Sequence, residues 1–153
     1  RGMTLDETGD DEVIGMICIK DPEKETVMVV SEQGYGKRSE IEDYRITNRG
    51  GKGVKTLNIT EKTGNLVAIK SVTDENDLVI INKSGITLRM KVADVRIMGR
   101  ATQGVRLINL EKRNDEIASV CKVLSETESD SSNSENIDSA SEINEAEASE
   151  TTE

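Results

Sequence analysis

The chain has 153 residues, of which 30 are acidic and 20 basic, with no histidine, phenylalanine or tryptophan and two tyrosines. This length suffices for about one domain, and the lack of histidine excludes Ser-His and Cys-His nucleophilic pairs. No apolar run reaches the ~18 residues that a membrane span needs. A core must therefore come from Val, Ile, Leu and Met, and the share of β-branched residues favours a sheet.

The same pattern of elements occurs more than once along the chain. Residues 1–5 resemble the end of a repeat unit, and Asp11–Ile19 is an apolar strand that opens the next unit. An apolar strand with a Gly-containing turn follows at Val27–Arg38, and then a basic, Gly-rich segment at Tyr44–Asn58. Both segments return 51 residues later, as Leu78–Arg89 and Val95–Asn109.

The second unit shows its strands most clearly, because turn residues separate them. Its opening strand resembles both Asp11–Ile19 and Asn114–Val123. Four short strands per repeat of about 50 residues are typical of a propeller blade. Blades bury their faces only against neighbours, so partners are expected on at least one side. The predicted strands are Leu66–Val72, Leu78–Asn82, Thr87–Lys91 and Val105–Leu110.

The prediction for residues 1–124 is an all-β, partial β-propeller or β-pinwheel. It contains the end of one blade, two repeats of 51 residues, and the first strand of another blade. Residues 125–153 hold ten acidic residues and no lysine or arginine. Such a segment cannot bury enough apolar surface to offset its ordering entropy. We predict a disordered acidic tail there, able to compete with a polyanion for basic residues.

Without that tail the chain is neutral, and its centre is basic. Gly34–Arg106 contains 14 Lys and Arg against 8 Asp and Glu. Arg45 maps to Arg96 across the repeat, and Arg49 maps to Arg100. Cations at the same place in successive blades line one rim, although a charged run can also be a merely solvated face.

Such a rim fits a long, bent polyanion such as duplex DNA, which carries about one charge per 1.7 Å of axis. The scarcity of aromatic residues argues against base stacking, so the predicted mode is phosphate contact with bending. The predicted DNA-binding residues are Lys37, Arg38, Arg45, Arg49, Lys52, Lys55, Arg89, Lys91, Arg96, Arg100 and Arg106.

The stretch "NRGGKG" (Asn48–Gly53) combines two cations with three glycines. Glycines let backbone N–H groups approach a phosphate closely, although a Gly-rich turn between strands is the simpler interpretation. The stretch lacks the spacing of a nucleotide-binding P-loop. The acidic turns Asp6–Glu12 and Thr73–Asp77 lack the spacing of a calcium loop. We therefore expect no metal or cofactor site, and we expect Cys18 and Cys121 to be buried, reduced thiols.

Two strings in the sequence are specific: "NRGGKGVK" (Asn48–Lys55) and "MGRATQGVRLINL" (Met98–Leu110). Together with the repeat, they resemble the C-terminal domain family of bacterial DNA gyrase A subunits, over all of the chain except the acidic tail. The resemblance implies a six-bladed β-pinwheel, in which neighbouring blades exchange strands and DNA wraps around a basic outer edge. It also implies a box-like loop of Arg49, Gly50, Gly51, Lys52 and Gly53, with Asn48 where the family has a basic residue.

The resemblance further implies a fragment of an ATP-dependent type II topoisomerase that introduces negative supercoils. In that family the catalytic tyrosine lies in another domain, so this chain alone should be inactive, and Tyr35 and Tyr44 have no catalytic role. ATP and Mg²⁺ act elsewhere in an assembly of two A and two B subunits, and the enzyme is cytoplasmic and nucleoid-associated. Two alternatives stay open: the matching domain of topoisomerase IV, and a protein-interaction propeller.

Overall fold

The computed structural model describes residues 2–6, 9, 11–110 and 115–125, so the predicted tail lies outside the described residues except for Ser125. The described part of the chain contains strands and two short 3₁₀ helices, and none of its helices is long and apolar enough to cross a membrane. The strands are β1 (Thr26–Ser31), β2 (Tyr35–Glu40), β3 (Leu66–Val72), β4 (Asn76–Asn82), β5 (Thr87–Lys91), β6 (Val105–Arg106) and β7 (Ile117–Leu124). The 3₁₀ helices are η1 (Ile41–Asp43) and η2 (Val92–Asp94).

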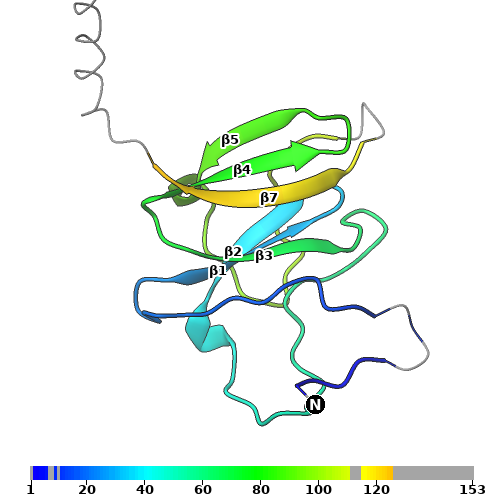
Figure 1. Cartoon of the computed structure of the whole chain (residues 1–153), viewed down its shortest axis with the longest axis vertical. Helices are drawn as coiled ribbons and strands as arrows, with labels where there is room; N and C mark the ends of the chain where they lie inside the picture. Colours follow the sequence, from blue (N-terminus) through cyan, green and yellow to red (C-terminus); the bar gives the residue numbers. More distant parts are fainter. Residues whose placement is uncertain (1, 7–8, 10, 111–114, 126–153) are drawn as a thin grey trace, which may run out of the picture.

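The strands form two antiparallel sheets, with the orders β3-β1-β2-β6 and β5-β4-β7. Figure 1 draws the sheet that contains β4 above the sheet that contains β1. Each sheet mixes successive repeat units: β3 and β6 of the second unit flank β1 and β2 of the first, and β7 of the third pairs with β4. The predicted all-β blades, with strands exchanged between neighbours, are therefore confirmed.

The repeat of 51 residues is reproduced in four pairs of elements, although β6 has no counterpart strand among the described residues of the first unit. Strands β1 and β4 correspond, as do β2 and β5, η1 and η2, and β3 and β7. The register shifts between Val30 and Ser31 in one sheet, and at the same place, between Ile81 and Asn82, in the other. A backbone irregularity that recurs at the same place belongs to the repeat and not to one blade.

The larger core lies between the two sheets. Met28 and Val30 of β1 pack there with Leu78 and Ile80 of β4, all at most 1% exposed. Successive residues of a strand face opposite sides, so Val27 and Val29 of β1 point the other way, into a second cluster with Leu57. The first blade is therefore buried on both faces.

The predicted strand Asp11–Ile19 is not formed. In this repeat, an opening strand pairs with β1 or its equivalent in the preceding unit, as β3 pairs with β1 and β7 with β4. The described residues contain no strand of a preceding unit that could pair with 11–19. Val13 and Met16 are consequently 63% and 92% exposed, and Cys18 is exposed as well.

Two other expectations also need correction. The predicted strand Val105–Leu110 is limited to Val105 and Arg106, because the N–H groups of Leu107 and Ile108 both donate to the Gly34 carbonyl and turn the chain away. Cys121, which was expected to be buried, lies on β7 at a position that faces solvent.

Candidate nucleic-acid interface

Two of the predicted DNA-binding cations point inward. Lys37 is fully buried and Arg38 is 4% exposed, which removes both from direct contact with a phosphate. Arg38 donates from Nε to Thr26 Oγ1 (3.2 Å) and from Nη1 to Asp74 Oδ1 (2.7 Å). It also donates to the Val92 carbonyl (3.0 Å), so it ties the first blade to the turn before β4 and to η2.

Arg89 occupies the place of Arg38 in the second unit, and it makes the matching bond. Its Nε donates to Asp77 Oδ2 (2.8 Å), and Asp77 stands where the first unit has Thr26. Hydrogen bonds from Ser125 and Arg89 lower the pKa of Asp77. The arginine at this place therefore takes part in the bonding of its own blade in both units, although Arg38 is buried and Arg89 is exposed.

The glycine-rich loop 48–53 exposes Arg49 and Lys52, as its sequence predicts. Gly50 and Gly53 have φ angles of 82° and 81°, in a region that glycine adopts more readily than any other residue. The Gly50 N–H donates to the Gly2 carbonyl (2.8 Å), and Thr4 N donates to the Gly51 carbonyl (3.0 Å). The Gly50 N–H is thus used by the chain itself and is not available to an anion.

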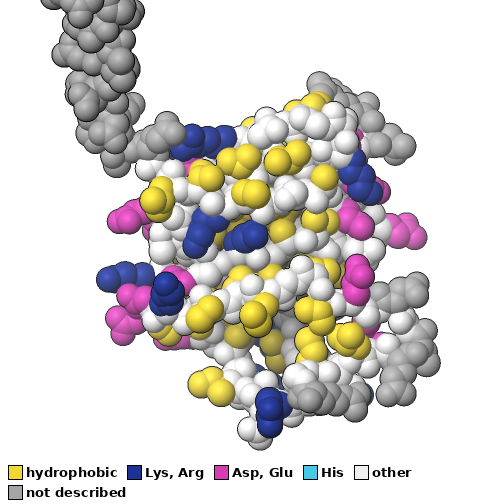
Figure 2. Space-filling view, in the orientation of Figure 1, with side chains coloured by type: hydrophobic (Ala, Val, Ile, Leu, Met, Phe, Trp, Pro, Cys, Tyr) yellow, Lys and Arg dark blue, Asp and Glu magenta, His cyan; other side chains and the backbone are white. Residues whose placement is uncertain are grey.

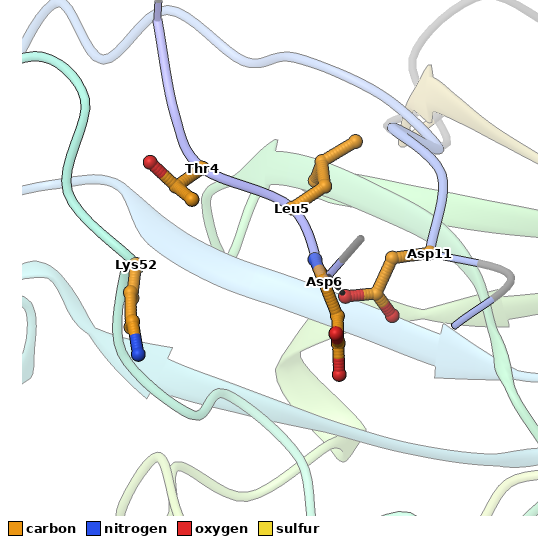
Figure 3. A pocket seen from close by; sticks show the side chains of 5 residues that line it. All are labelled: Thr4, Leu5, Asp6, Asp11 and Lys52. Carbon is orange, nitrogen blue, oxygen red and sulfur yellow. Dashed lines mark hydrogen bonds between the residues drawn. The ribbon is translucent and has the colours of Figure 1, made fainter. Parts of the chain in front are cut away.

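Lys52 has acidic neighbours that the linear sequence did not reveal. A surface pocket brings it beside Thr4, Leu5, Asp6 and Asp11 (Figure 3). The Asp6 N–H donates to Asp11 Oδ2 (3.1 Å) across the acidic turn. The acidic run itself was visible in the sequence, but its position beside a loop more than 40 residues away depends on the fold.

A cation of the second unit reaches the backbone of the first unit at the boundary between them. Arg100, in the loop Gly99–Gly104 of the second unit, donates from Nη1 to the Lys55 carbonyl (2.8 Å). The Asn58 N–H donates to the Thr102 carbonyl (3.1 Å) and fixes the same junction. The bond from Thr4 N to the Gly51 carbonyl is the corresponding contact one unit earlier, which fits residues 1–5 as the end of a unit.

Arg106 packs against Tyr35. The same ring is contacted by Lys62, which is not among the DNA-binding residues predicted from sequence. Arg106 donates from Nε and Nη2 to Tyr35 Oη (3.3 and 2.9 Å), and its guanidinium lies 5.5 Å from the ring centroid. Lys62 Nζ approaches the same ring at 5.7 Å. Both distances fall within the range of cation–π attraction. The only sequence signal for Lys62 was its place in a turn between two units.

The remaining predicted cations are on the surface. Arg45 and Arg96 are exposed, and each follows its 3₁₀ helix at the same spacing. Lys91 is exposed too, but Glu40 takes its place in the first unit, so no cation recurs there. Figure 2 shows Lys and Arg side chains at the edges of the drawn face and near its centre, with Asp and Glu between them at the edges.

Comparison with known proteins agrees with this architecture. The family model for the DNA gyrase C-terminal domain, β-propeller, matches residues 25–73 and 76–121, which is more than half of the chain. This chain belongs to the DNA gyrase C-terminal domain family. The A subunit of DNA gyrase from Staphylococcus aureus strain NCTC 8325 / PS 47 is 45% identical over 135 residues, covering 88% of this chain and 15% of the relative. That of strain MRSA252 is 51% identical over 110 residues, covering 72% of this chain and 12% of the relative.

Two solved structures share the fold. A DNA gyrase A C-terminal domain has a TM-score of 0.62 and 27% identity, covering 67% of this chain and 34% of that one. The C-terminal domain of a DNA topoisomerase IV has a TM-score of 0.73 and 21% identity, covering 80% of this chain and 37% of that one, a likeness of fold alone. The chain thus spans well under a fifth of the two gyrase A subunits and about a third of each solved domain.

Within this member of the gyrase family, three places carry a cation in both units and leave it at the surface or at the junction. They are the residue pairs Arg45 and Arg96, Arg49 and Arg100, and Lys55 and Arg106. The Arg100 side chain contacts the backbone carbonyl of Lys55 in the preceding unit, while the Lys55 ammonium donates to Asn58 Oδ1 (3.0 Å). We call these six residues the repeated cations.

Proposed function

We propose that this chain binds duplex DNA through the repeated cations, and that it bends the duplex from one blade to the next. The observation that carries the proposal is the junction at which the Arg100 guanidinium of the second unit donates to the backbone carbonyl of Lys55 in the first unit, so that cationic residues of successive units lie next to each other in the fold. Binding that depends on phosphates needs only Lys and Arg placed along the path of the duplex. Lys52 adds a further cation beside Arg49, while the buried Lys37 and Arg38 are left out of the interface.

For the whole protein we propose the role of the gyrase A chain in an ATP-dependent type II topoisomerase. Wrapping of DNA on this domain would let the enzyme introduce negative supercoils. The partners would be duplex DNA, two B subunits and another copy of the A chain, in the bacterial cytoplasm at the nucleoid. Strand cleavage would use a tyrosine in another domain, and ATP and Mg²⁺ would act elsewhere, so this part alone would not catalyse the reaction.

A topoisomerase IV origin is the nearest alternative, because a domain of that enzyme shares the fold. Sequence similarity favours gyrase, since the S. aureus relatives named as gyrase A match over most of the chain. A protein-interaction propeller with an incidental basic rim is the alternative from another class. DNA binding and bending separate it from the main proposal.

The test is a bending assay on a duplex of about 40 base pairs, well below the ~150-base-pair persistence length, with a fluorophore at each end. The chain should bring the ends closer and raise energy transfer between the fluorophores. Changing Arg45, Arg49, Arg96 and Arg100 to Gln together should abolish this rise, because it removes four of the six repeated cations, two from each unit.

The matched control changes four lysines outside the proposed interface to Gln, namely Lys20, Lys24, Lys70 and Lys83. This control removes the same charge and should leave the bending signal near that of the unmodified chain. Equal bending by both variants would contradict the proposed interface. Undetectable binding by the unmodified chain at low salt would favour the protein-interaction alternative.

A further inference from the structure

The Gly99–Gly104 loop rests on a buried cation. Lys37 extends from β2 under the loop, and its Nζ donates to the carbonyls of Gly99 (2.7 Å) and Arg100 and to Thr102 Oγ1 (3.3 Å). An ammonium has three N–H donors and no acceptor, so this set of three oxygens uses its full capacity.

Other contacts press the same loop onto β2. The Met98 N–H donates to the Arg38 carbonyl (2.8 Å), and Ser39 Oγ donates to the Met98 carbonyl (2.9 Å). Gly104 has a φ of 82°, and a Cβ there would lie 2.6 Å from the Gly36 carbonyl oxygen. The loop therefore has little freedom to lift from the strand, and Lys37 fills the space beneath it.

The hydrogen bonds from Lys37 fix the position of the Arg100 backbone, from which the Arg100 side chain extends. The Arg100 carbonyl is held by Lys37 from below, while the Arg100 guanidinium reaches the Lys55 carbonyl of the preceding unit. We propose that Lys37 is a positioning residue for DNA binding, which holds the Gly99–Gly104 loop so that Arg100 stands beside Lys55 and meets the phosphate backbone. This inference rests on the proposed function, since it assigns a role within that interface.

The protonation of Lys37 should respond to a phosphate that binds at Arg100. Burial lowers the pKa of Lys37 to about 8, with Asp43 of η1 raising it and Arg100 lowering it. A phosphate at Arg100 would offset the repulsion from the guanidinium and favour the charged lysine. Affinity for DNA should therefore fall as the pH rises through about 8, because the unbound protein then loses the ammonium that the bound form prefers.

A double-mutant cycle tests the role. Arg100→Gln should weaken duplex binding, and Lys37→Met should weaken it roughly tenfold, within the usual range for coupled neighbours. If Lys37 acts through Arg100, the double variant should bind duplex DNA only slightly more weakly than Arg100→Gln alone. Lys24→Met, which removes the same charge from an exposed side chain, should bind like the unmodified chain.

The pH profile gives a second reading that loss of folding alone would not produce. The unmodified chain should lose affinity between pH 7 and 9, while Lys37→Arg, which stays charged, should not. Thermal unfolding of each variant shows whether it is folded. If Lys37→Met does not fold, the profiles of the unmodified chain and Lys37→Arg decide, and an identical pH dependence in the two would overturn the inference.

The two proposals can fail separately. An unmodified chain that does not bind duplex DNA at low salt contradicts the proposed function. An unmodified chain that binds, with losses from Lys37→Met and Arg100→Gln that simply add, contradicts only the role of Lys37.

Discussion

At the scale of single residues, the same side-chain type serves two purposes in this protein. Arg38 and Arg96 are both arginines of the basic centre, yet Arg38 is 4% exposed and bonded to three groups, while Arg96 is exposed. A cation that faces the core holds units together, and only a cation that faces solvent is available to a phosphate.

Replacing each arginine with Met separates these purposes. Arg38→Met should lower the free energy of unfolding by about 1–3 kcal/mol, because buried oxygens lose their donors. Asp74 is 73% exposed, so the loss of its ion pair adds little. Arg96→Met should stay within about 0.5 kcal/mol of the original stability and weaken DNA binding instead. Urea unfolding and duplex titration of both variants test this prediction. Equal losses of stability in the two variants would contradict the structural role of Arg38 and the binding role of Arg96.

Asp115 makes the stability of the fold depend on pH in the acidic range. Hydrogen bonds from Ser84 and Asn82 lower the pKa of Asp115 to about 2 in the folded chain. Its contribution is complete above the ordinary pKa of about 3.8 and is lost as the pH falls toward 2. Melting temperatures of the chain and of Asp115→Asn should therefore converge between pH 4 and pH 2, and a gap of constant size would contradict this source of stability.

At the scale of elements, each blade is completed by strands of the next unit. This exchange requires a tight turn between β1 and β2, because the segment that follows β6 in the next unit packs against that turn. Gly34 occupies that turn with a φ of 78°, and a Cβ there would lie 2.6 Å from the Ile108 carbonyl oxygen. Gly85, its counterpart between β4 and β5, has a φ of 85° and open space around it.

These two glycines form a natural pair for substitution. Gly85→Ala should cost about 1–2 kcal/mol, the penalty of a left-handed backbone alone. Gly34→Ala should cost more, because the added methyl also displaces the segment that follows β6. Chemical denaturation measures both, and equal costs would mean that the strand exchange at this turn is not tightly packed.

Parts of this organisation could be predicted from sequence because they are periodic. The repeat of 51 residues predicted Leu66–Val72 and Thr87–Lys91 at their observed bounds. Strand formation at Asp11–Ile19 could not be judged from its apolar pattern, because pairing depends on a strand of another unit. The burial of Lys37 and the acidic neighbours of Lys52 likewise come from contacts between distant segments.

At the scale of the whole molecule, the two blades place equivalent cations one after another. Propeller blades related by a repeat present equivalent residues on the same edge. The hydrogen bond from Arg100 to the Lys55 carbonyl places a cationic residue of one unit next to a cationic residue of the other. The central claim is therefore that both units contribute to one path for a duplex.

The most direct test is the salt dependence of duplex binding by three proteins: the unmodified chain, Arg45→Gln with Arg49→Gln, and Arg96→Gln with Arg100→Gln. Each phosphate contact contributes about −0.9 to the slope of log affinity against log salt concentration. We predict that each pair of substitutions makes the slope shallower by about 1.8, which is two such contacts. A slope that changes for one pair and stays constant for the other would contradict a path shared by both units.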